Sequence, residues 1–77
     1  MKNFSKKEWT EFFSFLDALR ESGVTNMYGS SPYVMEEFNV KRDDAASIVL
    51  TWMKTFSREK TPAERAAEVT LTQVLQK

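Results

Sequence analysis

The stretch SPYVMEEFNVKRDDAASIVLTWM, residues 31–53, decides how the chain folds. Its opening Ser-Pro pair predicts a helix over 32–38 with Ser31 as the cap, because Pro fits the first helical position without losing a hydrogen bond. Asn39 tolerates positive φ better than most residues, so we expect it to end this helix in a left-handed turn. A longer helix is then predicted over 42–57. The stretch thus predicts two helices joined by a tight turn.

The predicted helix over 42–57 has one apolar face and one polar face. Apolar side chains recur along it with the period of a helix, which predicts a buried stripe. The stripe consists of Ala45, Ile48, Val49, Trp52, Met53 and Phe56. Asp43 and Asp44 lie in the first turn, where the helix dipole favours negative charge. We expect Trp52, the largest side chain of the stripe, at the centre of the core.

The order of residue types in 31–53 resembles the helix-turn-helix family, in which a short helix, a tight turn and a second helix form one unit. The resemblance is carried by apolar side chains at Val34, Phe38, Val40, Ala45 and Ile48. The chain departs from the family pattern at Asn39, where Gly is usual, and at Met35, where a small residue is usual. The resemblance implies a helix-turn-helix-like corner at this place in the fold.

Another resemblance lies just before and within this stretch. The segment ESGVTNMYG, residues 21–29, followed by Pro-Tyr at 32–33 and Glu-Glu-Phe at 36–38, is similar to short uncharacterised proteins of phage and bacterial genomes. This similarity implies no particular activity.

A first helix is predicted over 5–22. Residues 5–8 (SKKE) match a capping box, in which the Ser and Glu side chains each accept a hydrogen bond from a first-turn amide. Phe4 and Trp9 are placed for a hydrophobic staple, and Gly23 suits the left-handed stop. Apolar residues recur with a helical period at Trp9, Phe12, Phe13, Leu16 and Leu19.

A last helix is predicted to begin at residues 61–64 (TPAE), which form a second capping box, and to run to near the end of the chain. Its predicted apolar side consists of Ala63, Ala66, Ala67, Thr70, Leu71, Val74 and Leu75. This side is smaller than that of the first helix, and it either completes the core or docks on another chain. The fold expected is all-α: a small bundle of four helices in a single domain, residues 1–77.

The size of the chain favours self-association. A domain of 77 residues is marginal alone, and small scaffolds usually gain stability from a disulfide, a metal or a partner. The chain has no Cys and no His, so a disulfide is excluded and the commonest metal ligand is missing. We therefore expect a homodimer. The expected interface residues are Phe15, Ala46, Leu50, Leu71 and Leu75.

The sequence lacks the side chains of an active site. Without His, a Ser or Thr nucleophile would need a Lys or carboxylate base, and no nucleophile-elbow, S-x-x-K or P-loop spacing occurs. The acidic pairs at 36–37 and 43–44 do not follow the spacing of a calcium loop, so solvated helix faces explain them better. No enzyme activity, cofactor or metal is expected. The sequence favours a non-catalytic protein–protein interaction or regulatory module.

The alternative function is a helix-turn-helix regulator that binds DNA. Its phosphate contacts would be Lys41, Arg42, Lys54, Arg58 and Lys60. The net charge of zero and the two acids beside Arg42 disfavour this alternative. The outward side of the same helix also offers no Asn, Gln or second Arg that could read bases.

No apolar stretch approaches the roughly 20 residues of a membrane span, and the charged beginning of the chain lacks the apolar core of a signal peptide. We therefore expect a cytoplasmic protein without a membrane partner.

Overall fold

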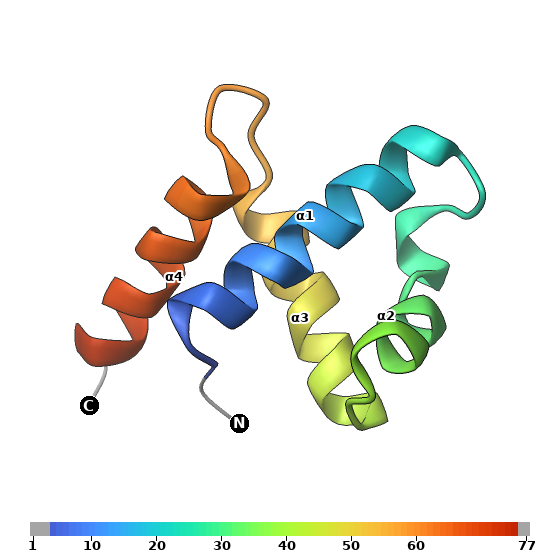
Figure 1. Ribbon diagram of the computed structural model, residues 1–77, viewed down its shortest axis with the longest axis horizontal. Coiled ribbons are helices and arrows are strands. Elements are labelled where there is room, and N and C mark those ends of the chain that lie inside the picture. The colour runs from blue at the N-terminus through green and yellow to red at the C-terminus, as the bar shows by residue number, and fades with distance from the viewer. Residues whose placement is uncertain (1–3, 76–77) are drawn as a thin grey trace.

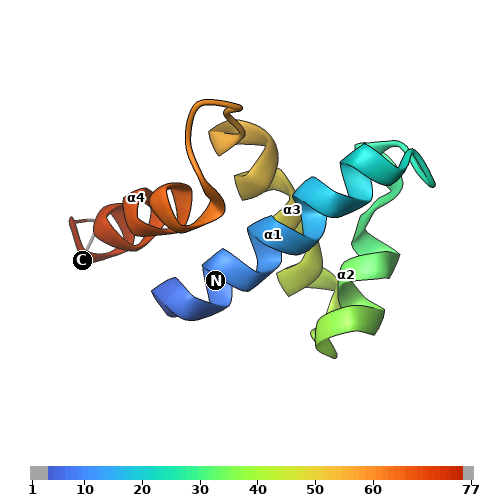
Figure 2. The same ribbon diagram turned by 45° about the horizontal axis from the view of Figure 1, so that its top comes forward.

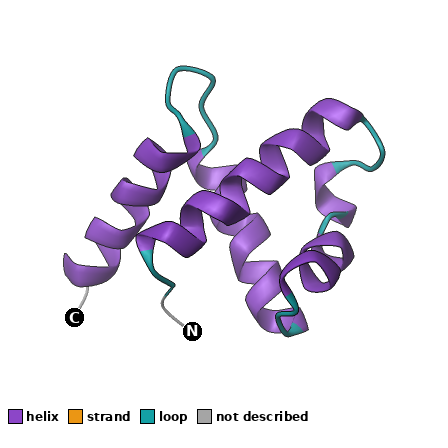
Figure 3. Cartoon of the chain, in the orientation of Figure 1, coloured by secondary structure: helices purple, strands orange, loops and turns teal. Residues whose placement is uncertain are grey.

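The computed structural model describes residues 4–75, apart from the side chains of Tyr28, Val74 and Leu75. This part of the chain contains four α-helices and no strand (Figure 3). The helices are α1 (Lys6–Ser22), α2 (Ser31–Phe38), α3 (Arg42–Thr55) and α4 (Pro62–Leu75), with a 3-10 turn, η1 (Met27–Gly29), between α1 and α2. The predicted all-α fold of four helices is confirmed.

Helix α1 is the central element of the fold. It packs against α4 and against α3, while α2 packs against α3 (Figure 1). Helices α4 and α2 lie at opposite ends of the molecule in both views (Figures 1 and 2). The buried apolar side chains are Phe4, Trp9, Phe12, Phe13, Leu16, Leu19, Val34, Ala45, Ile48, Val49, Trp52 and Ala66. α1 therefore contributes the largest share of the core, and α3 most of the remainder.

The predicted start and end of α1 are confirmed. The backbone N–H of Glu8 donates to Ser5 Oγ at 3.1 Å, and the backbone N–H of Ser5 donates to Glu8 Oε1 at 2.9 Å. The rings of Phe4 and Trp9 meet edge to face with centroids 5.3 Å apart, which is the expected staple. Gly23 ends the helix at φ 68°, where a Cβ would be strained.

The corner between α2 and α3 turns at Asn39, whose φ of 54° confirms the predicted left-handed residue. The prediction of Ser31 as the cap of α2 is wrong by one residue, because Ser30 occupies that position. The Ser30 hydroxyl is buried and donates to the carbonyl of Met27 at 2.6 Å instead of capping the helix. Ser30 thus closes the loop that precedes α2.

The predicted inward face of α3 is confirmed. Ala45, Ile48, Val49 and Trp52 are buried, and Trp52 is only 3% exposed. The remaining two members of the stripe, Met53 and Phe56, are half-buried and pack at the edge of the core.

The predicted inward face of α4 is wrong in part. Ala66 is buried as predicted, but Ala63 is exposed and Leu71 is 61% exposed. The helix is rotated so that Arg65, which is only 1% exposed, points into the core. The reason is an ion pair between Arg65 and Asp17 of α1, which a prediction from apolar spacing does not anticipate.

The predicted capping box of α4 is confirmed. The backbone N–H of Glu64 donates to Thr61 Oγ1 at 3.1 Å, and the backbone N–H of Thr61 donates to Glu64 Oε1 at 2.9 Å. The hydrogen bond from the Thr61 backbone lowers the pKa of Glu64 below its ordinary value of 4.5.

The cap of α1 can be tested by Ser5→Ala. The loss of the side-chain acceptor should lower the free energy of unfolding by about 1 kcal/mol. In a domain of this size the melting temperature should then fall by about 4–8 °C. Ser14→Ala is the matched control, because Ser14 is exposed in the interior of α1 and its replacement by Ala should be neutral or slightly stabilising. Equal melting temperatures for the two variants would contradict the capping role.

The charge of Glu64 can be tested by Glu64→Gln, which keeps a hydrogen-bonding side chain in the box. The folded pKa of Glu64 is lowered, so its charge stabilises the fold above the ordinary pKa of 4.5, and this contribution disappears as pH falls through the folded pKa. At neutral pH the natural protein should therefore melt at a higher temperature than the variant. Thermal melts in acid should show the two converging, and a gap that persists or widens in acid would contradict this role.

Candidate interaction surface

Two large apolar side chains on the long helices are left uncovered. Leu50 on α3 is 53% exposed and Leu71 on α4 is 61% exposed. Ala46, one turn before Leu50, is also exposed. These three residues of the predicted interface thus lie on outward faces of their helices. Val24 and Tyr33 are further exposed apolar residues, but they lie outside α3 and α4.

The outward face of α3 has a defined order of side chains. Asp43, Ala46, Leu50 and Lys54 are exposed, and they recur at steps of three or four residues, which aligns them in one stripe along the helix. Ser47, which is half-buried, borders the stripe. The stripe has an acid at its beginning, small and apolar side chains at its centre and a base at its end.

The other two residues of the predicted interface are placed differently. Phe15 is half-buried, and its ring packs edge to face on Phe38 with centroids 5.4 Å apart. Phe15 of α1 is thus covered in part by α2 of the same chain. The side chain of Leu75 lies outside the described residues.

The structure does not bring the five basic residues of the DNA alternative together. Residues 41–42 flank the start of α3, whereas Lys54 lies near its end, about 18 Å along the axis from Arg42. Arg58 and Lys60 lie on the loop before α4. Lys60 forms an ion pair and a hydrogen bond with Glu68, which raise the pKa of Lys60 above its ordinary value of 10.5. The positive charges are therefore spread along α3 and the next loop.

A partly buried polar cluster joins three helices. Arg65 of α4 donates from Nη1 to Asp17 Oδ1 at 3.2 Å and from Nη2 to Asp17 Oδ2 at 2.5 Å. Trp52 of α3 donates from Nε1 to the same Oδ1 at 2.8 Å. The guanidinium also lies over the rings of Phe13 and Phe56, with centroids at 5.6 and 5.5 Å. Asp17 is thus the hub that links α1, α3 and α4.

The sequence prediction missed this cluster, although the sequence carries a signal for it. Asp17 follows Phe13 by four residues, so it shares the inward side of α1. Arg65 likewise lies between Pro62 and Val69 at helical spacing, on the side of α4 that is now seen to face the core. Opposite charges at inward positions of two helices predict a buried ion pair.

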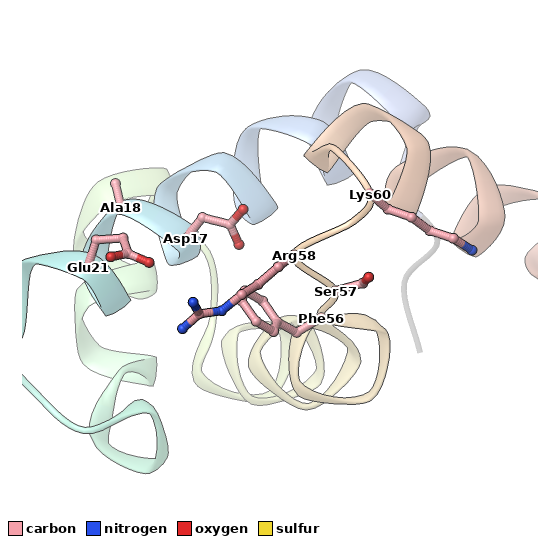
Figure 4. Close-up of a pocket in the computed structure, with 7 residues that line it drawn as sticks. All are labelled: Asp17, Ala18, Glu21, Phe56, Ser57, Arg58 and Lys60. Atoms are coloured by element: carbon pink, nitrogen blue, oxygen red, sulfur yellow. The ribbon is translucent and has the colours of Figure 1, made fainter.

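An open pocket of about 310 Å³ lies beside this cluster (Figure 4). Asp17, Ala18 and Glu21 reach it from α1, and residues 56–58 with Lys60 line it from the end of α3 and the next loop. Both oxygens of Asp17 already accept hydrogen bonds from Arg65. The Lys60 ammonium points away from the α1 carboxylates in Figure 4. The pocket thus does not gather unengaged groups around one point.

The described residues offer no metal centre, since no three Asp or Glu side chains among them gather where they could hold an ion. In the same part of the chain, no helix combines the length and the apolar character that a membrane crossing requires. The chain matches no protein-family model, no curated protein and no solved structure. The uncovered faces of α3 and α4 are therefore the features of the described chain that indicate a function.

The buried ion pair can be tested by Asp17→Asn. This change leaves the Arg65 guanidinium buried without its counter-charge, so it should destabilise the fold by about 3–5 kcal/mol in denaturant unfolding. The double variant Asp17→Asn with Arg65→Met removes both charges and should lose much less than the sum of the two single variants. Additive losses would show that the pair does not hold α4 on α1.

Proposed function

We propose that the chain is a non-catalytic interaction module that pairs with a second copy of itself in the cytoplasm. The observation that carries this proposal is that the side chains of Leu50 and Leu71 remain more than half exposed. An exposed Leu on its own is ordinary, but here each lies on the outward face of a long helix. On α3, the exposed Ala46 and Leu50 leave the middle of that face without charge.

The small apolar contribution of α4 to the core also supports pairing of two copies. Polar groups contribute to the packing of α4, namely the Arg65–Asp17 ion pair and Gln73, whose side chain accepts from Trp9 Nε1 at 3.1 Å. Ala66 is its one fully buried apolar side chain among the described residues. A domain with so small an apolar contribution from one helix gains stability by burying more surface on association. Two-fold pairs are the commonest soluble assemblies.

The rival function, DNA binding through α3, is supported by the exposed Lys41 and Arg42 at its start. Asp43 is exposed beside them and would approach the phosphates at an energetic cost. Leu50 would also face the charged backbone or the groove. An electrophoretic shift with duplex DNA at low salt would favour the rival, particularly if the affinity falls steeply as salt is added.

The proposal is tested by sedimentation of the natural protein at tens of micromolar and of the double variant Leu50→Glu with Leu71→Glu. The natural protein should sediment as a dimer, and the double variant as a monomer with an unchanged helical circular dichroism spectrum, because exposed sites tolerate substitution within about 0.5 kcal/mol. Ser14→Glu adds a charge at an exposed position of α1, and this variant should remain dimeric. A well-folded monomer for the natural protein would refute pairing.

A further inference from the structure

We propose that the second copy docks on α3, so that the α3 helices of the two copies lie antiparallel about a two-fold axis near the level of residues 48–49. This inference rests on the proposed function and adds which surface pairs and in which direction. It begins from the stripe formed by Asp43, Ala46, Leu50 and Lys54, all of them exposed.

The charges of the stripe are self-complementary in this direction only. A two-fold axis between residues 48 and 49 places Asp43 of one copy opposite Lys54 of the partner subunit, and the symmetry repeats the contact at the other end. In a parallel pair each of these charges would instead face its own copy and repel it. The helix dipoles are also antiparallel in the proposed arrangement.

Both charges are available for this contact. None of the ion pairs within the described part of the chain includes Asp43 or Lys54, and both residues are exposed. The two are about 16 Å apart along the helix, too far to pair with each other. An antiparallel α3 of the partner subunit has the same spacing of charges. It therefore offers a lysine opposite Asp43 and an aspartate opposite Lys54.

The centre of the stripe has the shapes that two close helices need. About the same axis, Leu50 lies opposite Ser47 of the partner subunit and beside Ala46 of the partner subunit. Small residues there leave room for the leucine, as in the interdigitation of side chains between packed helices. The Leu50 side chain is 53% exposed, and this contact would remove that apolar surface from water.

The outward face of α4 is a poorer match to itself. Leu71 on that face is accompanied by Glu64 and Glu68, both exposed. Lys60 is already paired with Glu68, and Arg65 is buried. Two such faces would bring acids together without a free base between them, so α3 is the better surface for an identical partner.

The test uses the full chain with Asp43→Lys or Lys54→Glu, each measured by sedimentation over a range of concentrations. Either change should raise the dimer Kd at least about tenfold, because each replaces two attractive contacts by two repulsive ones. Equimolar mixing of the two variants should restore dimers near the natural Kd. In a mixed pair the introduced lysine faces the introduced glutamate, and the natural Asp43 faces the natural Lys54, so both contacts are attractive. Mixing changes only the contacts between the chains, because each chain keeps its own substitution. A variant that failed to fold would therefore not be rescued.

Glu37→Lys and Lys41→Glu are matched controls, since they make the same charge changes at exposed positions outside the stripe and should leave the Kd within about twofold. Leu50→Glu alone should give monomers, whereas Leu71→Glu alone should remain dimeric. If the natural protein is a dimer that Leu71→Glu disrupts and the α3 variants do not, α3 pairing is wrong and the proposed function stands. A monomer at all concentrations, or one that binds DNA through Lys41 and Arg42, overturns both.

Discussion

The burial of one guanidinium constrains the rest of the structure. Arg65 is 1% exposed, and a buried cation is tolerated only when an opposite charge and further hydrogen bonds compensate its lost hydration. The Asp17 carboxylate supplies the opposite charge and accepts two hydrogen bonds from Arg65. These two bonds fix how α4 is rotated against α1 and where along α1 it packs. Because Trp52 donates to the same carboxylate, α3 is tied to this point too. Three helices are thus oriented by one acidic side chain.

The rotation of α4 determines which of its residues remain on the surface. With Arg65 turned inward, Ala66 and Val69 face α1, and Leu71 lies on the opposite side. Apolar spacing alone had placed Leu71 inward, because it assumes that charged residues of a helix point to solvent. That assumption fails where the partner of a charge lies 48 residues away in the sequence, since no local pattern records such a contact. The wrong prediction for the inward face of α4 and the exposure of Leu71 therefore have the same cause, the inward position of Arg65.

Features that depend on neighbours in sequence could be predicted well. The two capping boxes, Gly23 and Asn39 act on groups within three or four residues, so the ends of α1 and the corner between α2 and α3 follow from local chemistry. The candidate surface was predictable only in part, because exposure depends on which helices meet. Leu50 is exposed, as the period of α3 predicts. Phe15 was also predicted to face a partner, but Phe38 of α2 covers part of it.

The core side and the proposed docking surface are opposite faces of α3, so the packing of the core also fixes the position of the docking surface. On the inner side, Ile48 and Trp52 are buried, and the Trp52 indole is hydrogen-bonded to Asp17, so the helix is held against α1. A face presented by a fixed helix loses little conformational entropy when a partner binds it. In return, a partner on α3 stabilises the folded state by mass action. Because Trp52 of α3 also donates to the carboxylate that pairs with Arg65, that stabilisation extends to α4.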